Sequence, residues 1–148
     1  MIAQIIEADH TAGQEAFAVV GNATQPAWDA RAGEMDGFAT LWDTHGTMME
    51  RAIFPRLAAA AGGAALIEAL RDLQRQVTGA ATDLARRAAA RDEGGTWLTD
   101  FEALKRLFEA QCLRESTDLV PLIRERLPPD DIAAMTRDAR ALRQGKSA

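Results

Sequence analysis

Tyrosine is absent from this chain, cysteine occurs once, at Cys112, and histidine occurs only twice. A single cysteine excludes a disulfide within the chain and a cysteine-based metal cluster, so a reducing compartment such as the cytoplasm is the simplest location. The lack of tyrosine and of β-branched runs disfavours a β-sheet. Two histidines also limit any metal centre that depends on imidazole ligands.

Long hydrophobic runs and excess positive charge are missing as well. Charged residues interrupt the alanine-rich middle of the chain, which argues against a membrane span, and the first ten residues lack the layout of a secretory signal. The net charge of -5 would repel a phosphate backbone, and the arginines are interspersed with acids. We therefore expect a cytoplasmic protein that binds neither nucleic acid nor membranes.

Helix-forming residues are abundant, and apolar residues recur at spacings of three and four. The pattern predicts four long helices and one short helix, at about 2–20, 31–60, 65–91, 99–127 and 130–143. We expect one domain over residues 1–148: an all-α, four-helix up-and-down bundle of two related helix pairs (about 1–60 and 65–127), plus the short C-terminal helix.

Local signals mark the ends of these helices. Pro55 and Pro121 each remove a backbone donor late in a helix, so each should kink or end it. Thr99 followed by Glu102 has the spacing of a capping box and predicts the start of the fourth helix.

The two halves of the chain carry a weak internal repeat. The segments 41–43 (Leu-Trp-Asp) and 53–55 (Ile-Phe-Pro) match 107–109 (Leu-Phe-Glu) and 119–121 (Leu-Val-Pro) at one constant offset. The agreement extends to an acid and a proline, which chance explains poorly. The chain therefore consists of two related helix pairs.

Each long helix places one polar residue on its apolar stripe, and Glu115 follows the last of these by one turn; the four are His10, His45, Gln74 and Gln111. An unpaired buried amide or imidazole costs on the order of 1–3 kcal/mol, and a lone carboxylate costs more. We therefore predict a polar layer inside the bundle, in which these groups satisfy one another or a bound ion.

Three motifs carry a resemblance to a known family: Asp9-His10, the run from His45 to Glu50 before Ile53-Phe54-Pro55, and the run from Gln111 to Glu115 before Val120-Pro121. The layout resembles the hemerythrin-like (HHE) family, whose four-helix bundle holds a non-haem di-iron site. By that resemblance, His10 and His45 match metal ligands, and Glu115 matches the bridging carboxylate of the second half.

Other positions depart from the family pattern. Met49 stands where the first half's bridging carboxylate is expected, and Glu50 points roughly 100° away around the helix. Gln74 and Gln111 stand where histidines are expected, and amide oxygens are weak ligands for iron. We predict that these glutamines form a polar network and that a pair of irons is not held.

The sequence thus predicts a hemerythrin-like bundle that has lost di-iron chemistry, has no cofactor and is not an enzyme, and that acts through interaction or small-ligand sensing. Its partner would be an unidentified protein, including a second copy in a homodimer, or a small molecule. The alternative is a metal-binding protein in which His10, His45 and Glu115 hold one iron or zinc ion. Such a site would respond to oxygen, nitric oxide or redox state.

Overall fold

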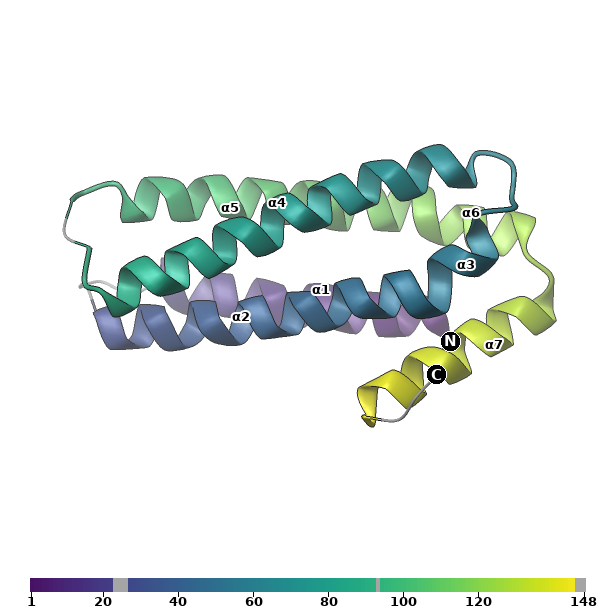
Figure 1. Cartoon of the computed structure of the whole chain (residues 1–148), viewed down its shortest axis with the longest axis horizontal. Coiled ribbons are helices and arrows are strands. Elements are labelled where there is room, and N and C mark those ends of the chain that lie inside the picture. Colours follow the sequence, from purple (N-terminus) through teal and green to yellow (C-terminus); the bar gives the residue numbers. More distant parts are fainter. Residues whose placement is uncertain (23–26, 93, 146–148) are drawn as a thin grey trace.

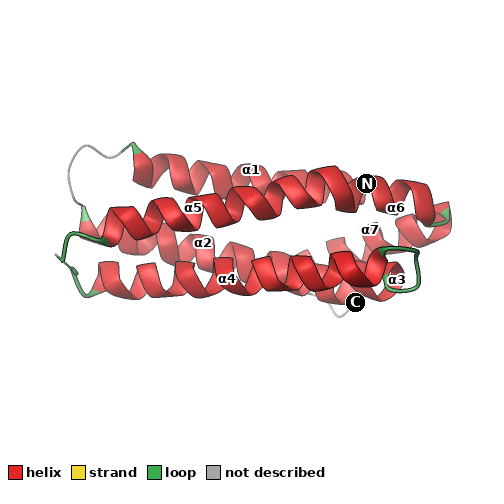
Figure 2. Ribbon diagram, turned by 90° about the horizontal axis from the view of Figure 1, so that it is seen from above, coloured by secondary structure: helices red, strands yellow, loops and turns green. Residues whose placement is uncertain are grey.

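A computed structural model describes residues 1–22, 27–92 and 94–145 of the chain, and the described part consists of helices joined by turns, without strands. Four long helices run along one axis and alternate in direction (Figures 1 and 2). Helix α2 packs against α1 and α4, and α4 packs against α5. The predicted all-α bundle is confirmed; the long helices are α1 (Ile2–Gly21), α2 (Trp28–Met48), α4 (Gly63–Ala89) and α5 (Trp97–Arg114).

Both halves of the bundle contain a π-helical turn just before a proline. Helix α2 continues into η1 (Met49–Ile53) and α3 (Phe54–Leu57), and α5 continues into η2 (Glu115–Leu119) and α6 (Val120–Arg126). A proline cannot donate to the carbonyl four residues earlier and its ring crowds that carbonyl, so the wider turn accommodates it. The kinks predicted from the prolines therefore take the form of two equivalent π-turns.

The start of α5 differs from the prediction. Thr96, not Thr99, is the N-cap, and the predicted capping box is wrong because the helix already begins at Trp97. The indole Nε1 of Trp97 donates to the carbonyl of Leu84 at 3.0 Å, and Thr96 Oγ1 accepts from Arg87 at 3.0 Å. These contacts with α4 place the start of α5 earlier than its local sequence indicates.

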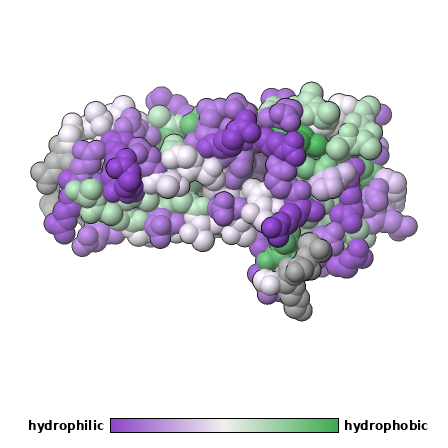
Figure 3. Space-filling view, in the orientation of Figure 1, coloured by the Kyte–Doolittle hydropathy of each residue, from purple (hydrophilic) through white to green (hydrophobic). Residues whose placement is uncertain are grey.

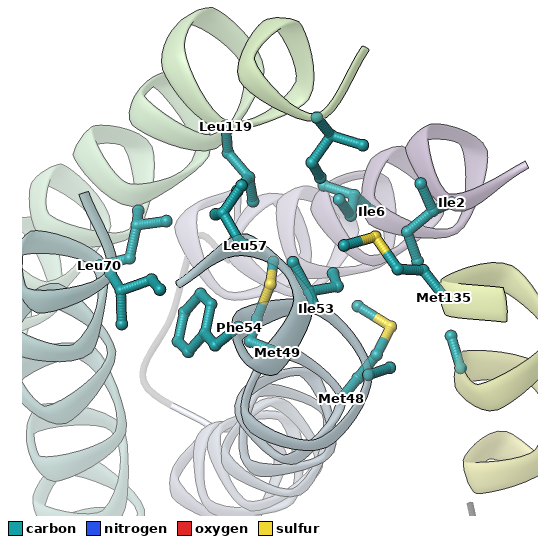
Figure 4. Close-up of a cluster of buried hydrophobic side chains, with 14 of the residues drawn as sticks. Ile2, Ile6, Met48, Met49, Ile53, Phe54, Leu57, Leu70, Leu119 and Met135 are labelled. Carbon is teal, nitrogen blue, oxygen red and sulfur yellow. The ribbon is translucent and has the colours of Figure 1, made fainter. Parts of the chain in front are cut away.

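The interior holds two apolar clusters, one toward each end of the bundle. The aromatic cluster lies at the end of the α1–α2 and α4–α5 connections and includes Phe17, Phe38, Trp42, Phe101 and Phe108. The aliphatic cluster lies around the π-turns (Figure 4) and includes Ile2, Ile6, Met48, Met49, Ile53, Leu119 and Met135. Met135 belongs to the short helix α7 (Pro129–Arg143), which closes this end of the core.

Hydrophilic residues cover most of the face seen in Figure 3, and paler and apolar residues gather toward the end where α3 and α6 lie. Among the described residues, no helix combines the length and the apolar character needed to span a bilayer.

Helix packing around Gly13 generates a prediction about stability. A Cβ atom at Gly13 would lie 2.6 Å from Cζ of Phe108 and 3.2 Å from Cε1 of Phe38. Alanine favours helix over glycine by about 1 kcal/mol, but overpacking a core costs about 1–3 kcal/mol. We expect Gly13→Ala to lower the free energy of unfolding in urea titrations.

The matched control is Gly37→Ala, because a Cβ there meets nothing within 4 Å. It should raise the free energy of unfolding by up to about 1 kcal/mol. Equal stabilisation by both substitutions would contradict the close approach of α1 to α5.

Candidate metal centre

A polar layer separates the aromatic cluster from the aliphatic cluster. On each long helix, the polar residue lies between residues of one cluster and residues of the other. The structure brings all five predicted side chains into this layer: His10 from α1, His45 from α2, Gln74 from α4, and Gln111 and Glu115 from α5 and the start of η2.

The carboxylate of Glu115 is the centre of the layer and is fully buried. Its Oε1 lies 2.8 Å from Nε2 of His10 and 2.9 Å from Nε2 of His45, while Oε2 lies 3.1 Å from the same His45 nitrogen. One ligand atom from each of these three residues falls within 4.8 Å of the other two. The two imidazoles therefore converge on one carboxylate.

His45 is held from its other side by the carboxylate of Asp9, which the sequence placed in a motif with His10 but gave no role. Its Nδ1 lies 2.7 Å from Oδ2 of Asp9, which is buried beside His10 on α1. Arg143 of α7 pairs with the same Asp9 oxygen and lies 3.6 Å from Sδ of Met48. The position of Asp9 on a buried turn was a usable signal, but nothing in the sequence pointed to Arg143.

Both nitrogens of His45 face carboxylates, which only accept hydrogen bonds, so both nitrogens donate and the ring is an imidazolium. Burial alone would lower the pKa of His45, but the negative charge of Glu115 and the bond to Asp9 outweigh it and raise the pKa to about 9. Burial would raise the pKa of Glu115, yet His45 and His10 lower it to about 2. Burial would also raise the pKa of Asp9. The hydrogen bonds and positive charges of His45 and Arg143 outweigh burial and lower that pKa.

Two glutamines extend the layer toward α4. Nε2 of Gln111 donates to Oε2 of Glu115 at 3.0 Å and to Oε1 of Gln74 at 2.7 Å. Oε1 of Gln111 accepts from the indole of Trp42 at 2.8 Å, and Nε2 of Gln74 donates to the Trp42 carbonyl at 2.7 Å. The absence of a side chain at Gly46 leaves room for Gln74, because a Cβ atom at this position would lie 2.7 Å from Nε2 of Gln74.

A cavity of about 590 Å³ between α2, η1 and α4 reaches this layer at Gln74, Gln111 and Glu115. Glu50 lines its outer part and forms a two-pronged ion pair with Arg71, at 2.6 and 2.9 Å. Glu50 is thus directed away from the layer, as its position on the helix predicts, while the thioether of Met49 is buried in the aliphatic cluster.

Comparison with models of known protein families identifies a match. The family model described as the hemerythrin HHE cation binding domain matches residues 1–123, which include all five side chains of the polar layer and Asp9 but not Arg143. Searches of the curated proteins and of the solved structures found no match.

The buried imidazolium predicts a pH-dependent stability of the metal-free protein. The pKa of His45 is about 9 in the folded chain and near 6.5 when unfolded, so its stabilising charge is fully present below pH 6.5. That contribution is lost as the pH rises toward 9, by up to roughly 3 kcal/mol. Urea denaturation of chelator-treated protein at pH 6 and pH 9 measures the loss.

Glu115→Gln serves as the control for this prediction, because removing the carboxylate charge lowers the pKa of His45. The difference in stability between the two pH values should shrink in this variant. A wild-type stability that is constant from pH 6 to pH 9 would show that folding does not raise the pKa of His45.

Proposed function

Because the chain belongs to the hemerythrin HHE cation-binding domain family, we propose that it binds one iron or zinc ion through His10, His45 and Glu115. The observation that carries this proposal is the convergence of both imidazole Nε2 atoms on one carboxylate oxygen, at 2.8 and 2.9 Å. The binding of a single ion replaces the di-iron chemistry of the family.

The donor set suits one transition-metal ion. Two imidazoles and a carboxylate are ligands that both zinc and ferrous iron accept, and the ion would take the place of the Nε2 protons that now bond Glu115. Asp9 bonds the far nitrogen of His45, the position at which a carboxylate commonly orients a metal-binding histidine. An ion held by three protein ligands would keep a position for water or a small molecule, which is the chemistry that sensing oxygen or nitric oxide requires.

We expect no second ion at this site. Gln111 turns its amide nitrogen toward Oε2 of Glu115 at 3.0 Å, so an N–H donor stands where a second cation would need a lone pair. The oxygen of Gln74 is occupied by that same amide, and Met49 supplies a thioether from the apolar core. We therefore do not propose that this chain carries oxygen on a pair of irons.

A second candidate is a protein without metal that senses a small ligand or binds another protein, and one observation favours it. The polar layer satisfies itself: within the described ranges, Arg31 Nε is the one buried polar side-chain atom that lacks a hydrogen-bond partner, and Arg31 lies by Trp28 and Trp97. A layer that is complete without an ion can be purely structural. Neither candidate assigns a catalytic residue.

Metal titration separates the two candidates. We expect the chelator-treated chain to take up one Zn²⁺ or Fe²⁺ per chain by calorimetry, with elemental analysis confirming the stoichiometry. Glu115→Gln should weaken binding by about 100-fold or more, because it removes the charged ligand that contacts both histidines.

Glu50→Gln is the matched control. Glu50 is a carboxylate that follows His45 on the same stretch of helix and lines the same cavity, but it pairs with Arg71 instead of the histidines. It should leave the affinity unchanged. Two tightly bound irons per chain would contradict the proposal, and no uptake of either metal would favour the second candidate.

Replacing the three residues that depart from the family pattern should create a site for a second ion. We expect the triple variant Met49→Glu, Gln74→His and Gln111→His to bind two metal ions per chain, because these three positions line the same cavity as Glu115. Without metal, the new carboxylate would add a like charge near Glu115, so the apo variant should unfold at a lower temperature than the wild type.

Added Fe²⁺ or Zn²⁺ should return that stability, since an ion that binds only the folded chain stabilises it. Thermal unfolding with and without metal measures both effects. A triple variant that folds normally but gains no metal-dependent stability would contradict the expected geometry.

A further inference from the structure

A second cavity, of about 830 Å³, lies in the elbow between α6 and α7 and is separate from the metal centre. Apart from Met1, every residue lining it comes after residue 123, where the family match ends. We call it the elbow pocket. Its size falls within the range of about 300–1,000 Å³ that is usual for small-molecule sites.

The wall of the elbow pocket is apolar. Leu127, Ile132, Ala133 and Ala141 line it from the α6–α7 connection and from α7. Leu127 and Ile132 also pack against the aliphatic cluster, which fixes this part of the wall to the core. An alkyl chain lying on this wall would leave water and gain about 0.8 kcal/mol for each buried CH₂ group.

The charged side chains that line the pocket are all positive. Arg124, Arg137 and Arg140 line it, and none of its described lining residues is acidic, although the whole chain has a net charge of -5. Arg137 lies 3.8 Å from Asp138. Within residues 1–22, 27–92 and 94–145, no carboxylate forms an ion pair with Arg124 or Arg140. The N–H groups of both side chains can therefore donate to a ligand.

From this combination we propose that the elbow pocket binds one small amphipathic anion, an unbranched alkyl chain that ends in a carboxylate. The apolar wall would take the chain, and Arg124 and Arg140 would donate to the head group from α6 and α7. Guanidinium groups match a carboxylate because they can offer two parallel N–H donors. This proposal does not depend on metal binding, since none of the metal-centre residues lines the pocket.

Calorimetry with dodecanoate at concentrations below micelle formation tests the proposal on the metal-free full chain. We expect one dodecanoate per chain. Dodecanol, which keeps the chain but lacks the charge, and acetate, which keeps the charge but lacks the chain, should both bind at least about tenfold more weakly.

Variants locate the site. Arg124→Gln and Arg140→Gln should each weaken dodecanoate binding about tenfold, because each removes a charged hydrogen-bond donor. Ala133→Trp should weaken binding, because the indole would occupy part of the pocket. Arg126→Gln is the matched control: it lies on the same helix as Arg124 and does not line the pocket, so it should change the affinity less than about twofold.

Several results would overturn the proposal. One is the absence of dodecanoate binding, and another is equal weakening by the Arg124 and Arg126 variants. Binding of dodecanol as tight as that of dodecanoate would show that the head group is not recognised. Binding to anionic phospholipid vesicles without binding of monomeric dodecanoate would identify a membrane surface as the ligand instead.

Discussion

The rest of the structure depends on the burial of one carboxylate, Glu115, in the middle of a four-helix bundle. A lone charge in such a place would cost far more than the stability of a small domain, so it requires partners from other helices. The buried network supplies them in equal number: Glu115 and Asp9 are negative, and His45 and Arg143 are positive. Both carboxylates therefore face a positively charged group in the described part of the network.

This requirement also orders the helices. The polar layer lies between two apolar clusters, and a helix that slid by one turn would place its polar residue among apolar neighbours. The contact from Arg143 to Asp9 adds α7 to the same arrangement, although α7 lies beyond the segment that matches the family. The layer thus specifies alignment in addition to chemistry.

Periodicity and the internal repeat were sufficient to predict the bundle and the layer, because both depend on which face of a helix a residue occupies. That reasoning found His10, His45, Gln111 and Glu115. It could not find Arg143, because that contact depends on the path of the chain through α6 and α7. It also misplaced the start of α5, since contacts with α4 and not local capping determine where that helix begins.

The two π-turns explain why the halves of the bundle can share a backbone and differ in chemistry. η1 begins at Met49 and η2 begins at Glu115, so the equivalent residue opens the wide turn in each half. Pro55 and Pro121 follow at the same distance, and the wide turn accommodates each of them whichever side chain opens it. The backbone therefore directs two equivalent residues, Met49 and Glu115, into the interior of the bundle. The side chains alone make one of them a ligand and the other part of the apolar core.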